Sequence, residues 1–239
     1  MTPPVWVLEL ARELPAPARF PRDLRGELAF GPANVVVVDL PRLTAGSVGE
    51  HLDRCGITVG IRSGELSLRG CVFAWRGEAI LFVAADDPED ERRHTLAHEL
   101  AHFLRHYRQP RRRCATLMGE GILGVLDGDR PPTPAEAIHA ALRGVPLGPH
   151  VQLIGRTAVH AAEAEADRLA CELLAPAAAV RSRLPPNFGT GDVERELTTT
   201  FGLPAGLARL YARDFVPNVP AGRGWPDSLR NILPKASNS

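Results

Sequence analysis

Residues 94–106 read His94-Thr-Leu-Ala-His98-Glu99-Leu-Ala-His102-Phe-Leu-Arg-His106. Residues four apart on a helix share a face, so His98 and His102 can each turn one nitrogen toward a common metal ion. Glu99 follows about 100° round the helix, where it can reach a water on that metal without binding the metal itself. This HExxH pattern is the zincin arrangement of two histidine ligands and a general base. The residues between them are apolar, which places the pair on a largely buried helix.

The outer histidines of this stretch are predicted to flank the site. A helix drifts about 40° with each four-residue step, so His94 and His106 do not converge on the same ion as the inner pair. The metzincin extension of the motif is absent, because Arg105 and Arg108 stand where that class has Gly and His. The helix is predicted to end near Tyr107, and the third metal ligand must come from elsewhere in the chain.

A second helix, predicted over Ala158–Leu174, offers the third ligand. Glu163 and Asp167 are four apart on one face. A glutamate that binds zinc, followed one turn later by an acid that orients a ligating histidine, suits a gluzincin. Two alternatives stay open on the residues alone. His160 lies one turn earlier and could be the ligand, or the helix could be an ordinary amphipathic one with a solvated acidic face.

The rest of the chain predicts an α+β fold. Strands are expected at Asn34–Leu40 and Ile57–Ile61, and a hairpin at Leu66–Trp75 and Ala79–Ala84 turns at Arg76-Gly77-Glu78. These strands form a small mixed or antiparallel sheet that packs on the HExxH helix, and the C-terminal part is mostly helical. Residues 1–33 are predicted to be an irregular segment with one short helix, 34–215 the zinc metallopeptidase domain and 216–239 a flexible tail. Within the domain, 114–157 form a long connection with one short helix, and 176–215 form C-terminal helices.

Composition narrows the possible function. The 239 residues carry zero formal net charge, which gives no general attraction to nucleic acid, and the run of arginines after His102 is predicted to be a solvated helix end. The sharper alternative, a nucleic-acid patch, lacks interleaved aromatic residues. No apolar stretch approaches the ~20 residues of a membrane helix. The four cysteines are widely scattered, so we predict reduced thiols in a cytoplasmic protein.

Two motifs together are similar to those of the ImmA/IrrE-type metallopeptidases. They are Thr95-Leu-Ala-His-Glu-Leu-Ala-His102 and, later, Glu163-Ala-Glu-Ala-Asp167-Arg-Leu-Ala-Cys-Glu-Leu-Leu-Ala-Pro176. The resemblance covers roughly residues 45–215. It departs from the family pattern at Ala101, Leu169 and Ala175, which are packing positions, and in the long spacing between the two motifs.

The resemblance implies a gluzincin-like domain that holds one zinc ion per chain on His98, His102 and Glu163, with Asp167 behind them. It further implies a cytoplasmic endopeptidase with a narrow protein substrate, such as a small helix-turn-helix repressor in a stress or mobile-element response. The strand formed by Ile80, Leu81, Phe82 and Val83 is expected to offer an edge on which the substrate adds as a further strand. Two rival functions are a zinc-containing module that binds protein or DNA without cleavage, and a hydrolase of non-peptide amides.

Overall fold

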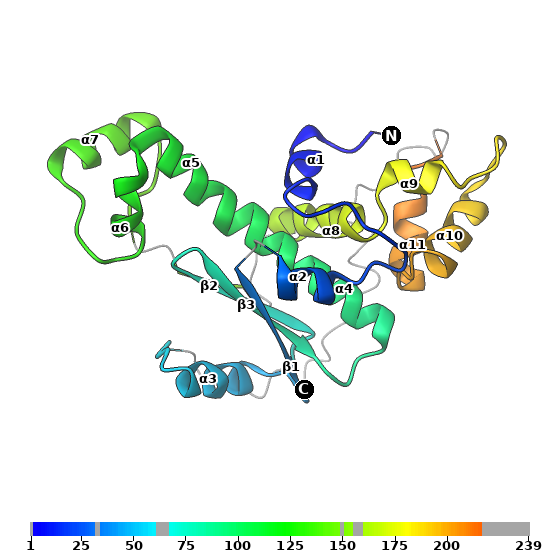
Figure 1. Cartoon of the computed structure of the whole chain (residues 1–239), viewed down its shortest axis with the longest axis horizontal. Coiled ribbons are helices and arrows are strands. Elements are labelled where there is room, and N and C mark those ends of the chain that lie inside the picture. Colours follow the sequence, from blue (N-terminus) through cyan, green and yellow to red (C-terminus); the bar gives the residue numbers. More distant parts are fainter. Residues whose placement is uncertain (1, 32–33, 61–66, 149–150, 155–159, 217–239) are drawn as a thin grey trace.

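A mixed sheet between helical layers organises the chain (Figure 1). The computed structural model describes residues 2–31, 34–60, 67–148, 151–154 and 160–216, the side chains of 152–154 excepted. One face of the sheet packs on the HExxH helix and the larger core, while the other face packs on helix α3 (Ala45–Arg54). The fold is therefore α+β, as predicted.

The sheet contains β1 (Val35–Leu40), β2 (Gly70–Trp75), β3 (Glu78–Ala84) and β4 (Gln152–Ile154), in the order β1-β3-β2-β4. Strand β1 runs parallel to β3, whereas β2 is antiparallel to both β3 and β4. Successive side chains alternate between the two cores, as a strand requires. In β2, for example, Val72 and Ala74 join the larger core, and Cys71 and Phe73 join the core beneath α3.

The prediction that Ile80, Leu81, Phe82 and Val83 form a free edge is wrong. These residues lie in β3, which pairs with the hairpin strand β2 on one side and with β1 on the other. A hairpin alone would leave one side of β3 open, and the parallel strand β1 occupies that side. The outer strands among the described residues are β1 and β4.

The HExxH helix is longer than expected. It begins as α4 (Glu89–His102), passes through the π-helical turn η1 (Phe103–Arg108) and continues as α5 (Gln109–Met118). The predicted end near Tyr107 rested on Pro110, which lacks the N–H of a regular helix. The wide turn of η1 comes directly before that proline, and the helix continues beyond it.

The N-terminal segment 1–33 is more ordered than the predicted irregular segment. Two helices lie within it, α1 (Val5–Ala11) and α2 (Leu24–Phe30), and both bury apolar side chains in the larger core. The buried Arg22 ties the segment down. Its guanidinium donates to the carbonyl of Leu173 in helix α8 (His160–Leu174) and forms an ion pair with Glu27.

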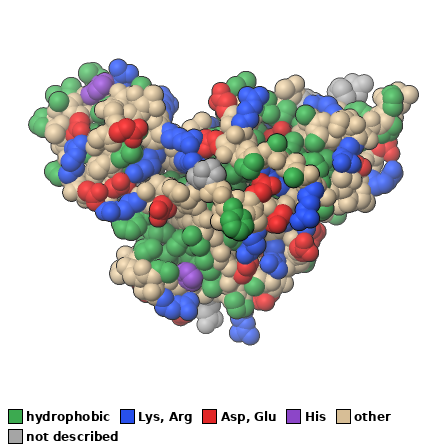
Figure 2. All heavy atoms as spheres, viewed as in Figure 1, with side chains coloured by type: hydrophobic (Ala, Val, Ile, Leu, Met, Phe, Trp, Pro, Cys, Tyr) green, Lys and Arg blue, Asp and Glu red, His purple; other side chains and the backbone are tan. Residues whose placement is uncertain are grey.

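The connection 114–157 also holds more structure than the single short helix predicted. After α5 come the 3₁₀ turn η2 (Glu120–Ile122), α6 (Leu123–Leu126) and α7 (Pro134–Arg143), which is the helix expected. The end of α5 shares a small apolar core with α6. These helices form a lobe that projects from the rest of the molecule in Figures 1 and 2.

The C-terminal part is helical, as expected. Its helices are α8 (His160–Leu174), α9 (Ala177–Arg181), α10 (Thr190–Thr199) and α11 (Ala205–Ala212). The tail predicted from 216 onward lies outside the described residues, apart from Val216.

The backbone after α3 differs from the sequence prediction. The strand predicted at Ile57–Ile61 is absent from its described residues, 57–60, because the N–H of Ile57 bonds to the carbonyl of Leu52 and closes α3 instead.

All four cysteines are free thiols. Acidic and basic side chains are interspersed on the face shown in Figure 2. No described helix combines the length and apolar character needed to cross a bilayer.

Candidate metal centre

The polar residues of the two motifs meet where α8 packs against α4. Leu169, Ala166 and Leu173 of α8 are fully buried in the larger core and fix this helix against the HExxH helix. Residues four apart on each helix then face one another. The arrangement places the pair from α4, His98 and His102, opposite the pair from α8.

Three side chains converge on one point. The Nε2 atoms of His98 and His102 lie 3.0 Å apart. The carboxylate of Glu163 lies 3.2 Å from the Nε2 atom of His98 and 3.4 Å from that of His102. Tetrahedral zinc, with ligands about 2.0–2.2 Å from the ion, spaces its ligand atoms about 3.3 Å apart. The three residues therefore fit a metal ion, which they could hold between them.

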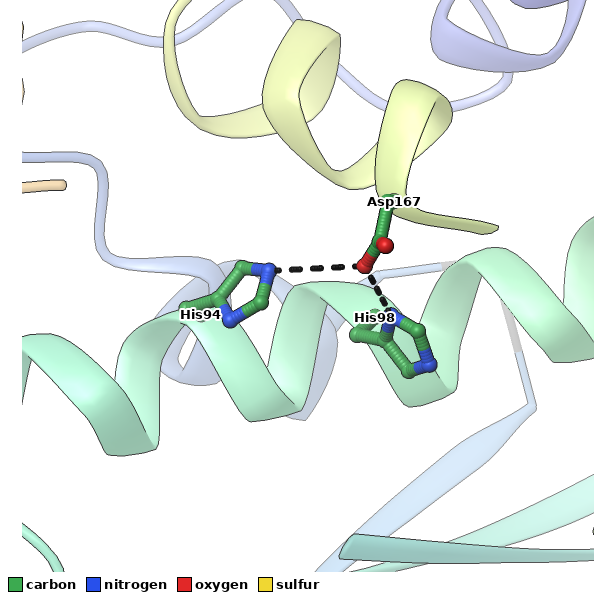
Figure 3. A group of neighbouring side chains, drawn as sticks. All are labelled: His94, His98 and Asp167. Atoms are coloured by element: carbon green, nitrogen blue, oxygen red, sulfur yellow. Dashed lines mark hydrogen bonds and ion pairs between the residues drawn. The ribbon is translucent and has the colours of Figure 1, made fainter. Parts of the chain in front are cut away.

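Asp167 lies behind this group. Figure 3 shows its Oδ1 atom facing the rings of His98 and His94. The distance is 2.8 Å to Nδ1 of His98 and 3.9 Å to Nε2 of His94. With the Nδ1–H of His98 donating to this carboxylate, the Nε2 lone pair is directed toward Glu163 and His102. The sequence expectation placed Asp167 in this orienting position and His94 beside the site.

Glu99 is buried next to the three converging side chains. It is 6% exposed, and its Oε2 atom has no hydrogen-bond partner among the described residues. Burial raises the pKa of Glu99 to about 8, with the charge of His98 opposing the rise and that of Glu163 adding to it. A buried carboxylate with an unused oxygen and a raised pKa holds a proton more readily than an ordinary glutamate, which suits a group that accepts and returns one.

The charged side chains around Glu99 shift one another's pKa values. Burial alone would lower the pKa of His98, but hydrogen bonds to Asp167 and Glu163 raise it well above the usual value. Burial alone would raise the pKa of Glu163, but His102 and His98 hold it well below its usual range. The metal-free centre therefore binds a proton between these groups, and a metal ion must displace that proton.

Sequence reasoning missed the role of Gly70, the first residue of β2. A Cβ atom built at this position would lie 2.5 Å from Oε1 of Glu99 and 2.5 Å from Cγ2 of Thr95. Only glycine lets the strand approach the helix this closely. A glycine inside the predicted strand Leu66–Trp75 was the available signal, but its partner on the helix is a tertiary contact.

Sequence reasoning also missed the contacts of η1 with α8. The guanidinium of Arg105 donates to both carboxylate oxygens of Glu165, at 2.9 and 3.1 Å. His106 Nε2 lies 3.3 Å from the carbonyl oxygen of Ala162, the residue before Glu163. A π-helical turn at this place is typical of functional sites, and here it ties the HExxH helix to the first turn of α8.

Other candidates lie elsewhere. His160 begins α8 and is exposed, and it belongs to none of the potential metal groups found among the described residues. The hydroxyl of Tyr107 accepts from the N–H of Gly77 in the hairpin turn, and that of Tyr211 donates to Glu172. Neither of these hydrogen bonds involves a residue of the metal centre.

Comparison with known proteins bears on the first of the two motifs. Residues 52–120 match the family model of the IrrE N-terminal-like domain, a metallopeptidase-type family. The matched segment runs from the end of α3 to the end of α5 and includes the whole HExxH stretch. It confirms the resemblance to the ImmA/IrrE family. No curated protein and no solved structure gave a match.

Proposed function

We propose, on the premise that residues 52–120 form an IrrE N-terminal-like domain, that this protein is a zinc-dependent endopeptidase with a gluzincin-like site. One observation carries the proposal. The Nε2 atoms of His98 and His102 and the carboxylate of Glu163 lie 3.0–3.4 Å from one another, and the buried Glu99 follows the first histidine directly.

The donor set supports zinc as the metal. Two imidazole nitrogens and one carboxylate are the ligands of many catalytic zinc sites, in which a fourth position stays open. A purely structural zinc site normally has four protein ligands. Zinc held there would polarise the scissile carbonyl and lower the pKa of a water molecule in the open position.

The protein's own side chains carry out the proton transfers and position the metal ligands. Glu99 takes a proton from the attacking water, whose oxygen forms a bond to the carbonyl carbon. Glu99 then gives the proton to the amide nitrogen as the carbon–nitrogen bond breaks, so an acid and an amine leave. Asp167 holds the ring of His98, and Glu163 would hold the metal through its negatively charged carboxylate, together with the two histidines.

The substrate class follows from the family resemblance. We extend the proposal to a cytoplasmic enzyme with a narrow protein substrate, for which a small helix-turn-helix repressor in a stress or mobile-element response is the first candidate. The long connection between the two motifs supports a narrow choice, because its segment Gly144–Pro146 lines a groove together with His106 and Glu165, which lie near the centre.

The test is the variant Glu99→Gln, co-expressed with candidate repressors encoded beside this protein. We expect the variant to bind one zinc per chain, as the wild type does, and to cleave at least about 100-fold more slowly, since a positioned base contributes 10²–10⁴-fold. Glu50→Gln, at an exposed position of α3, is the matched control and should cleave normally. Full cleavage by Glu99→Gln would contradict the base assignment, and wild-type binding of a repressor without new fragments would favour a binding module.

A further inference from the structure

A groove of about 520 Å³ runs along the HExxH helix beyond the metal centre. One wall is a single face of η1 and α5, because its residues recur one helical turn apart. They include Arg105, His106, Gln109, Pro110 and Arg113. The opposite wall is the segment Gly144–Pro146 at the end of α7, and Glu165 of α8 lies in the lining as well.

The inner end of the groove adjoins the metal centre. The ring of His106 lies with its centroid 5.3 Å from that of His102. The same ring contacts the carbonyl of Ala162, directly before Glu163. The groove therefore begins next to the centre, where a polypeptide with its scissile bond at the centre would continue.

The charges of the groove are unequal. Arg105 is neutralised by both oxygens of Glu165, and its guanidinium also stacks 4.5 Å from the ring centroid of Trp6. The next arginines of α5 are paired as well, Arg111 with Asp127 at 2.7 Å and Arg112 with Glu13 at 2.5 Å. Arg113, by contrast, is exposed and has no ion pair or hydrogen bond among the described residues. Among the described residues that line the groove, Arg113 is thus the one arginine without an ion-pair partner. It lies at the end of the groove away from the metal centre.

The distance to that cation can be expressed in residues of an extended chain. Arg113 follows His102, the nearer of the two histidines of the metal centre, by eleven residues, or about 16 Å of helix. An extended chain advances about 3.3 Å per residue. A substrate side chain that reaches Arg113 therefore belongs about five residues from the bond at the metal centre.

We propose that this groove binds the substrate chain on one side of the scissile bond, and that Arg113 selects an Asp or Glu side chain about five residues away from that bond. This inference rests on the proposed function. A guanidinium pairs with a carboxylate through two parallel hydrogen bonds, which favours an acid over an amide of the same shape. A Lys or Arg at the same substrate position would meet like charge.

The test compares zinc-loaded wild type, Arg113→Glu and Arg54→Glu on two probes, a peptide library made from a digested bacterial proteome and the native proteins of a lysate. New N-termini are identified by mass spectrometry. We expect wild-type cleavage sites to be enriched about threefold to tenfold in Asp or Glu at the fourth to sixth residue on one side. Arg113→Glu should lose this enrichment and gain Lys or Arg there. Arg54→Glu, on the helix that covers the other face of the sheet, should behave as wild type.

The outcomes separate the two proposals. Cleavage with the same residue preference in wild type and Arg113→Glu, or without any acidic preference in wild type, would overturn the groove assignment and leave the peptidase intact. The absence of new N-termini from both probes with zinc-loaded wild type, together with the absence of fragments from the co-expressed repressors, would overturn the proposed function itself. Cleavage of a repressor alone, at a site without Asp or Glu at the fourth to sixth residue, would overturn only the groove assignment. Zinc content and thermal unfolding of Arg113→Glu should match the wild type, since Arg113 contacts neither the metal centre nor the core.

Discussion

The Nδ1 atom of His98 lies 2.8 Å from the Oδ1 atom of Asp167, across the interface between α4 and α8. This bond decides which ring nitrogen of His98 carries a proton and which one is free to bind a metal. It also joins the two motifs of the chain directly, because one partner comes from each. The metal affinity of the centre therefore depends on a residue that does not bind the ion.

Replacing Asp167 by Ala is expected to weaken zinc binding by about 10- to 100-fold, the usual effect of losing a carboxylate behind a ligating histidine. The dissociation constant is measured by competition with a chromogenic chelator. Glu165→Ala is the control, since it removes an acid from the same helix whose partner is Arg105 rather than a ligand. Equal losses in both variants would show that Asp167 acts only through general charge.

The identity of the third ligand is decided by a second pair of variants. Glu163→Ala should lower zinc affinity by more than the about 10- to 100-fold typical of residues behind the ligands, because it removes a direct donor. His160→Ala should leave the affinity unchanged, since His160 is exposed at the start of α8. The same chelator titration measures both. A large loss in His160→Ala with a small one in Glu163→Ala would reverse the assignment.

Local spacing explains why so much of the centre was predictable. The positions of His98, Glu99 and His102 follow from one helix, and those of Glu163 and Asp167 from another. The periodicity of an α-helix is fixed, so each set shares a face wherever the helix lies. Both motifs resemble those of one family, so the two sets of residues were predicted to lie together. In the structure they are in contact.

Contacts between distant segments explain what was missed. The pairing of Val36 with Ile80 joins residues far apart in sequence, so the hairpin alone left β3 with an apparent free edge. The approach of Gly70 to Glu99 depends on how the sheet packs on α4. The π-helical turn that carries Arg105 toward Glu165 has no simple sequence period, and the groove along it was therefore not predicted.

The close approach of Gly70 to Glu99 makes a third prediction. Gly70→Ala introduces a Cβ atom for which the strand and the helix leave no room, at 2.5 Å from Oε1 of Glu99. The carboxylate must move, so peptide cleavage should fall at least about tenfold while zinc stays bound. Overpacking of this kind also costs about 1–3 kcal/mol of unfolding free energy.

The control for this variant is Gly191→Ala in α10, where an added Cβ meets no atom within 4 Å. Cleavage, zinc content and urea unfolding are measured on both variants. Gly191→Ala should keep all three near wild-type values. Normal cleavage by Gly70→Ala would mean that Glu99 acts equally well from a displaced position, which contradicts its assignment as a positioned base.

The last prediction concerns Glu172, a buried carboxyl of α8 away from the metal centre. Burial raises its pKa above the ordinary 4.5, although the Ala177 N–H and the Tyr211 hydroxyl donate to it and oppose the rise. Between pH 4.5 and the raised value, the folded protein holds a proton that the unfolded chain has lost. The unfolding free energy should therefore fall as pH rises through this window, by at most about 1.4 kcal/mol per pH unit from this group.

Glu172→Gln removes that titration and keeps an oxygen for the N–H of Ala177. Urea unfolding of the metal-free protein, measured at steps from pH 4.5 to neutrality, should show a flatter pH dependence in this variant than in the wild type. Glu50→Gln, at an exposed position of α3, should follow the wild-type curve. Parallel curves for Glu172→Gln and wild type would mean that Glu172 has the same pKa in the folded and unfolded chains, because only a difference in bound protons produces the slope.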